Sequence, residues 1–328
     1  MPTNPADAAT PSPATVAAHP WRGYLYIAAA TFCWAAAATV GKAVFNESLF
    51  AGRAQISPLL LTQARTSFSV LVLSLFLLVR FGRSFFRIAP RDLILSVLAG
   101  TLGVAGSNFF YYLAIEKATV AIAITLQYTA PVWVLTYMVL RGRERAAWSR
   151  VLSVALAMVG IALTIGLFQS GLKLNVAGAA AALVASFSFA FYNIVAPSLV
   201  RRNHHLKVML YTLLGAAVLW TLLNPPWRLA NQGYNAPQWG FLFAFACLSM
   251  LLPYIFYFNG LKYLDPTRAV IASCLEPVFA ILFAAAFVHE RLHGLQVIGI
   301  AAVLAATVMA QARSGSEDQS QTKALSCP

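Results

Sequence analysis

The chain has too little charge to cover a surface that faces water. Only 10% of its 328 residues are charged, whereas soluble domains carry about 25% charged residues. Hydrophobic residues make up 60% of the chain, and the mean hydropathy is +0.72. No polar segment is long enough to form a soluble domain. These shortages exclude an ordinary soluble enzyme and indicate a protein embedded in a lipid bilayer.

Sequence motifs for catalysis and metal binding are also missing. We find no P-loop, no GxGxxG motif after a strand, no HExxH and no GxSxG. The four cysteines show no CxxC or Cys/His spacing, so neither a disulfide framework nor a zinc site is indicated. The apolar runs hold no histidine pair and no acidic pair that a membrane-embedded enzyme would need. We therefore predict no catalytic residues, no metal and no cofactor.

The chain has a net charge of +13, and this excess of basic residues follows the pattern of membrane topology. The lysines and arginines form short clusters between apolar runs, which does not indicate a nucleic-acid-binding face. The expected partners are instead the lipid bilayer and a small-molecule substrate. The sequence does not specify an oligomeric state.

Ten apolar runs have about the 20 residues that a membrane-spanning helix needs. The fold class is therefore predicted to be an all-α integral membrane protein with ten transmembrane helices. The expected spans are roughly 23–45, 58–80, 92–113, 119–140, 148–168, 176–199, 206–223, 238–261, 267–288 and 294–311.

The placement of lysine and arginine predicts the orientation of these spans. With the N-terminus inside, the inner segments hold 16 of the 23 basic residues and the outer segments hold 6, while Arg65 falls within a span. Cytoplasmic segments carry the excess of basic residues in membrane proteins. Both termini are therefore expected to be cytoplasmic.

One sequence pattern occurs twice in the chain. Pro131 and Pro277 are 146 positions apart, and so are Glu144 and Glu290. Two landmarks that keep one offset indicate a duplicated unit. Because each half holds five spans, an odd number, the second copy enters the membrane from the opposite side, as in many secondary transporters.

This duplication predicts four parts of the chain. They are a disordered tail, a first five-helix repeat, a second inverted five-helix repeat and a second disordered tail, at 1–21, 22–170, 171–312 and 313–328.

The repeated pattern resembles that of a known family. Each half has a Gly and an aromatic residue in its first span, and a Pro-x12-Glu-Arg motif follows. The first half also has an Arg in its second span. Together these features are similar to the EamA-type ten-helix group of the drug/metabolite transporter superfamily. The most specific stretches are Glu276-Pro-Val-Phe-Ala and His289-Glu-Arg-Leu, and the resemblance covers roughly residues 22–311. The first half departs from the second in having Ala130 where the second has Glu276.

The resemblance implies a ten-helix basket with a central cavity between the halves, in the inner membrane of a bacterium. It also implies export of amino acids or similar small metabolites; this group includes an exporter of aromatic amino acids. The Pro-x12-Glu-Arg motif is structural in this family, so neither Glu144 nor Glu290 is expected in the substrate site.

Two charged residues within the apolar spans are the first candidates for a substrate site. A charge at the centre of a span costs about 2.5–3.5 kcal/mol on insertion scales. Glu276 lies near mid-span, and Arg65 lies about 10 Å into its span at 1.5 Å per residue. Glu276 could bind a substrate ammonium, carry a coupling proton or pair structurally. Arg65 could recognise a carboxylate, extend to the membrane interface or form an ion pair with Glu276.

A second group of candidates comes from the repeat. Asn108 and Tyr111 share one face of the third span. At the offset of 146 they correspond to Tyr254 and Tyr257 on the eighth span. These faces could line a cavity and stack on a substrate, or they could be packing aromatics whose hydroxyls bond across helices.

Four weaker candidates complete the predicted site. Gln127 and Ser273 each lie four residues before the proline of their half, and Trp34 and Asn193 lie in the first spans of the two halves. Each could instead bond only to a neighbouring helix.

The combined prediction is a secondary transporter that exports amino acids or related metabolites by alternating access. The alternatives are a passive channel or facilitator and a membrane scaffold that transports nothing. The substrate, the direction of transport and proton coupling are beyond the sequence.

Overall fold

A computed structural model describes residues 20–45, 58–117, 120–144, 147–165, 175–287 and 293–312, and all regular structure in these ranges is helical. The all-α prediction is confirmed. The predicted tails lie almost entirely outside the described residues, as do Arg145 and the second Glu-Arg pair at Glu290.

The helices of the first half follow the five predicted spans within a few residues. They are α1 (Pro20–Phe45), α2 (Pro58–Phe81), the 3-10 turn η1 (Arg83–Phe86), α3 (Pro90–Leu98), the π-helix η2 (Ala99–Ala105), α4 (Gly106–Lys117), α5 (Val120–Gln127), α6 (Ala130–Leu140) and α7 (Trp148–Thr164). The second half repeats this order. Its helices are α8 (Val176–Arg202), α9 (His205–Leu223), α10 (Pro226–Ala230), α11 (Ala236–Ala246), the π-helix η3 (Cys247–Leu251), α12 (Leu252–Gly260), α13 (Pro266–Ser273), α14 (Leu275–Phe287) and α15 (Gly294–Ala312).

Seven continuous helical stretches among the described residues are long and apolar enough to cross a membrane. Two more, Trp148–Thr164 and Gly294–Ala310, are shorter apolar helices. The membrane class predicted from the sequence is confirmed, and the count of ten spans stays a prediction.

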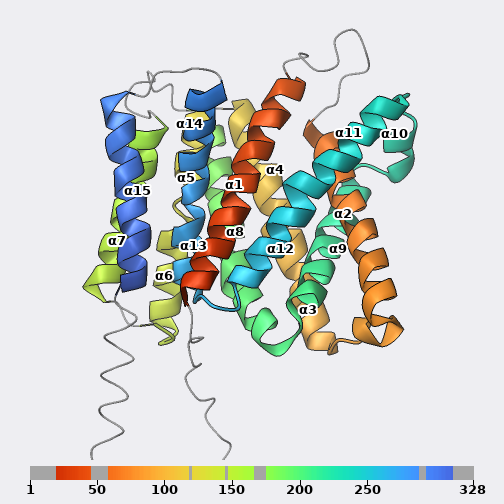
Figure 1. Cartoon of the computed structure of the whole chain (residues 1–328), viewed down its shortest axis with the longest axis horizontal. Helices are drawn as coiled ribbons and strands as arrows, with labels where there is room; N and C mark the ends of the chain where they lie inside the picture. Colours follow the sequence, from red (N-terminus) through yellow and green to blue (C-terminus); the bar gives the residue numbers. More distant parts are fainter. Residues whose placement is uncertain are drawn as a thin grey trace, which may run out of the picture.

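The two halves run in opposite directions. Figure 1 shows α1 rising from the lower edge and α8, the first helix of the second half, descending to it. The described chain begins with α1 and ends with α15 at this same edge. This antiparallel order is the inverted repeat that the odd number of spans predicts.

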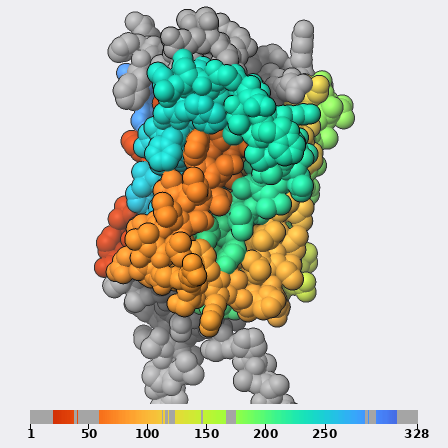
Figure 2. All heavy atoms as spheres, turned by 90° about the vertical axis from the view of Figure 1, so that its right-hand side faces the viewer, coloured from red at the N-terminus to blue at the C-terminus, as the bar shows by residue number. Residues whose placement is uncertain are grey.

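Each half packs its helices mainly against the other half. Helix α1 contacts α12, and its counterpart α8 contacts α4. Helices α2 and α9 contact each other, as do α6 and α13, and α7 and α15. Figure 2 shows α2 lying between α11 and α9 on one face of the molecule. The halves therefore interlock about a pseudo-two-fold axis.

The contact between η2 and α9 depends on a residue without a side chain. A Cβ atom at Gly100 would lie 1.9 Å from the backbone oxygen of Thr212. Small residues allow this approach, and packing of this kind holds membrane helices together because the lipid is as apolar as the helix surfaces.

Both fourth-span helices are broken just before a proline. Helix α5 ends at Gln127 and α6 contains Pro131, while α13 ends at Ser273 and α14 contains Pro277. Proline has no N–H, and its ring clashes with the carbonyl four residues earlier. That carbonyl belongs to Gln127 in one half and to Ser273 in the other, so each proline accounts for the break that precedes it.

We predict that Gly100→Ala lowers the melting temperature of the purified protein. The added Cβ forces η2 away from the rigid backbone of α9, and overpacking of this kind costs about 1–3 kcal/mol. The change is measured by thermal unfolding in detergent micelles.

Gly240→Ala in α11 is the matched control, because no atom lies within 4 Å of the added Cβ. A melting temperature equal for the two variants would contradict the close contact at Gly100.

Candidate functional site

Glu276 lies in the first turn of α14, directly after the break in the ninth predicted span. Its Oε2 accepts a hydrogen bond of 2.8 Å from the hydroxyl of Tyr128. Tyr128 itself lies in the break between α5 and α6. The carboxyl thus joins the two broken helices across the interface between the halves.

Arg65 on α2 is held by a hydrogen bond to Asn108 on α4. Its Nη2 donates to Oδ1 of Asn108 at 3.2 Å, and Nδ2 of Asn108 donates to the carbonyl of Val104 at 2.8 Å. The buried Nε of Arg65 has no hydrogen-bond partner. Arg65 and Glu276 form no ion pair with each other, so the guanidinium and the carboxyl each keep capacity to bind a ligand.

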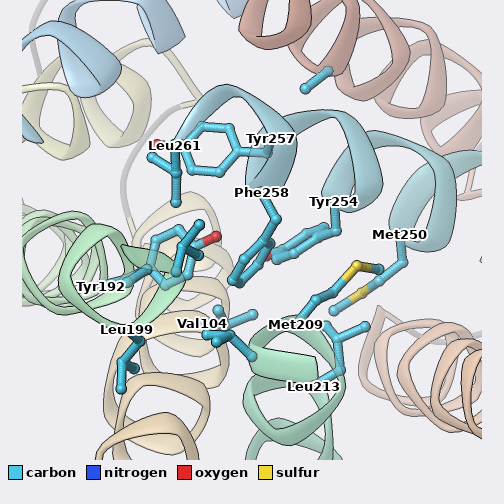
Figure 3. Packing of buried hydrophobic residues seen from close by; sticks show 14 of the residues in the cluster. Val104, Tyr192, Leu199, Met209, Leu213, Met250, Tyr254, Tyr257, Phe258 and Leu261 are labelled. Atoms are coloured by element: carbon cyan, nitrogen blue, oxygen red, sulfur yellow. The ribbon is translucent and has the colours of Figure 1, made fainter. Parts of the chain in front are cut away.

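Three of the predicted aromatic residues, Trp34, Tyr254 and Tyr257, meet at α12. The Trp34 ring lies 5.5 Å from Tyr254 and 5.4 Å from Tyr257 between centroids. The hydroxyl of Tyr257 donates to Oδ1 of Asn193. Figure 3 shows Tyr254 and Tyr257 of α12 directed toward Tyr192 of α8, whose ring lies 5.8 Å from that of Tyr257.

Of the remaining predicted residues, Gln127 and Tyr111 contact neighbouring helices. Nε2 of Gln127 donates to Oγ of Ser107 at 3.0 Å. Tyr111 packs beside the small-residue cluster that contains Ala114 and Ala182. Ser273 donates to the carbonyl of Val270 within its own helix.

Burial divides the ten predicted residues into two sets. Four are buried, and these form the aromatic and amide core: Asn193, Tyr254, Tyr257 and Ser273. Six keep part of their surface exposed: Trp34, Arg65, Asn108, Tyr111, Gln127 and Glu276. Of the buried set, Tyr254 and Tyr257 contact the ring of Trp34 and position it.

The sequence interpretation missed the partner of Glu276. Tyr128 lies three residues before Pro131 and two positions before Ala130, the position that corresponds to Glu276. The closeness of Tyr128 to the position equivalent to Glu276 was the one sequence feature that pointed to this partner. Tyr192 and Ser107 were also missed, because nothing in the sequence separates them from other polar residues in spans.

Glu144 lies in the turn after α6 and belongs to a separate ion-pair cluster. Its carboxylate accepts from Arg150, whose guanidinium also lies 3.7 Å from Asp265 of the second half. Burial and the charge of Asp265 raise the pKa of the Glu144 carboxyl above its usual range, and Arg150 opposes this. The described Glu144 thus has structural partners of the kind that the family resemblance implies.

Comparison with known proteins agrees with this architecture. An uncharacterized transporter of Archaeoglobus fulgidus is 27% identical over 214 residues, which cover 64% of this chain and 75% of that protein. The threonine/homoserine exporter RhtA of Salmonella typhimurium is 28% identical over 211 residues, or 63% and 68%. One crystal structure has the same fold, with a TM-score of 0.70 at 20% identity over 88% of this chain and 96% of that chain.

The model of the EamA-like transporter family matches twice, at residues 21–166 and 176–311. The relatives named above are membrane transporters and not enzymes. Because the matches cover both halves, the chain belongs to the EamA-like transporter family.

Proposed function

We propose that the protein is a secondary transporter that exports amino acids or related small metabolites by alternating access. The observation that supports this most directly is the Tyr128–Glu276 hydrogen bond between the two broken helices. Transporters of inverted-repeat type bind substrates where discontinuous helices of the two halves meet near the middle of the bilayer.

An amino acid suits the charges of Glu276 on α14 and Arg65 on α2. A carboxylate such as Glu276 binds an ammonium group, and the planar guanidinium of Arg65 suits a carboxylate. Each charge bonds to a neutral partner, Tyr128 or Asn108, and not to the other charge. Keeping two unpaired charges within apolar spans is costly, and binding a zwitterion offsets this cost. The relative named as a threonine/homoserine exporter supports the same class of substrate.

The packing of the halves supports alternating access. Helices α1 and α8 each pack on the third predicted span of the other half, at α12 and α4. A rocking motion of one half against the other exchanges these equivalent contacts. We also propose that both termini are cytoplasmic, in a bacterial inner membrane, because the basic residues gather in the predicted inner segments.

We predict saturable uptake of amino acids by liposomes that contain the purified protein. A panel that includes threonine, homoserine and the aromatic amino acids should show counterflow of at least one labelled substrate. Flux that does not saturate would indicate a channel. A folded protein that moves no member of the panel would indicate a scaffold or another substrate class and would count against amino-acid transport.

Glu276→Gln should lower the transport rate at limiting substrate by roughly 10- to 100-fold. This corresponds to the loss of a charge-assisted bond of about 1.5–3 kcal/mol. If Glu276 carries a coupling proton, the same variant should lose the pH dependence of transport. Unchanged rate and pH dependence would remove Glu276 from the mechanism.

Tyr128→Phe should lower the same rate by about tenfold or less, because the charge remains but loses its positioning bond. Tyr137→Phe on α6 is the matched control, since no hydrogen bond of its hydroxyl is seen and its ring contact with Arg141 is kept. Equal rates in these two variants would show that the Tyr128–Glu276 bond has no role in transport.

A further inference from the structure

Three loops meet at one corner of the molecule, at the lower edge in Figure 1. The ring of Phe85, in the loop between α2 and α3, lies 5.2 Å from that of His204, in the loop between α8 and α9. His204 stacks on His205 at 4.4 Å, and Nε2 of His205 lies 3.4 Å from Nζ of Lys262, after α12. We call this group of loops the basic corner.

The basic corner carries a large excess of positive charge. Its segments 80–92 and 201–207 contain seven lysines and arginines and one acidic residue, Asp92. Asp92 is already engaged, because it lies 3.0 Å from Arg202 and accepts a bond of 2.7 Å from Asn203. Among the described residues, no carboxylate pairs with the exposed cations Arg80, Arg83, Arg87, Arg91 and Arg201.

The basic corner is held in a defined shape. The carbonyl of Arg87 accepts a bond of 2.7 Å from Lys207, and the carbonyl of Phe86 accepts one of 2.6 Å from Tyr211. Both donors are on α9, so the loop that presents the arginines is attached to a membrane helix. The arginine side chains themselves stay exposed, which leaves them free to bind an anion.

The surface next to these cations is apolar. The side chains on the outward face of α2 are exposed, and Val79, the residue before Arg80, is 80% exposed. This face continues through α2, and Figure 2 shows α2 and the segment that follows it on one open side of the molecule. In a membrane protein of this family such a face contacts lipid chains, so the cations lie where the headgroups of the same lipids are.

We propose that the basic corner binds the phosphodiester headgroup of an anionic phospholipid whose chains lie along α2. Arg83 and Arg87 supply planar guanidinium groups whose N–H donors suit phosphate oxygens. Basic clusters at the end of a transmembrane helix attract anionic headgroups. Phe81, the last residue of α2, stacks on Phe85 at 4.6 Å, and aromatic side chains at the ends of transmembrane helices favour the membrane interface.

The lowered pKa of His204 agrees with an excess of positive charge around its imidazole. Partial burial lowers the pKa of its imidazole, and the charges of Lys262 and Lys207 lower it further. The groups that face His204 are aromatic, basic or a second histidine, and they include no acid: Phe81, Phe85, His205, Lys207 and Lys262. A bound anion supplies the missing negative charge.

The first test is lipid binding to the intact protein in detergent, measured by native mass spectrometry. The probes are phosphatidylglycerol and phosphatidylcholine with the same acyl chains. Phosphatidylglycerol should bind more tightly, and Arg83→Gln/Arg87→Gln should weaken its binding by roughly thirtyfold, about fivefold for each cation removed. Arg228→Gln is the control, because this exposed arginine lies on α10 at the opposite edge of the molecule.

Three outcomes would overturn the proposal. They are equal affinity for the two lipids, an equal effect of the corner variant and the Arg228 control, and displacement of phosphatidylglycerol by millimolar inorganic phosphate. The last would identify a site for a soluble anion. A further measurement on the unaltered protein is the pKa of the His204 imidazole, determined by NMR in nanodiscs. Its pKa should be higher in phosphatidylglycerol than in phosphatidylcholine, and an equal pKa in both would also contradict the proposal.

Discussion

The structure depends on the reciprocal packing of two inverted halves. Neither half buries its own first and third spans; α1 packs on α12 and α8 packs on α4. In a bilayer the hydrophobic effect does not drive helices together, so this packing relies on close contact between small residues. Gly100 against Thr212 is the tightest example, because no side chain fits between the two backbones.

The packing of the two halves determines the position of the candidate site around Glu276. Pro131 and Pro277 each break a helix, and the interface between the halves brings the two breaks together. Glu276, in the first turn after the second break, accepts a hydrogen bond from Tyr128 of the other half. The Glu276 carboxyl is therefore bonded across the interface between the halves.

Charges outside the breaks have different roles that follow from their depth. The Glu144–Arg150–Asp265 cluster ties the halves together at a helix end, where ion pairs are partly shielded from water. The exposed arginines 80, 83, 87, 91 and 201 of the basic corner pair with no carboxylate among the described residues and lie beside an apolar face. The first cluster pairs acidic and basic side chains of the two halves, whereas an anionic lipid headgroup is proposed to complete the second.

The sequence alone determined the helical class, the positions of the helices, the proline breaks and the inverted duplication, because each follows from local composition or a fixed offset. It also pointed to Glu276 as the break in symmetry. Tertiary packing decided that Tyr128 is its partner, that Arg65 bonds to Asn108 and that Tyr257 is buried. These pairings join helices distant in the chain, and their geometry depends on how closely the backbones approach, which no spacing of residues encodes.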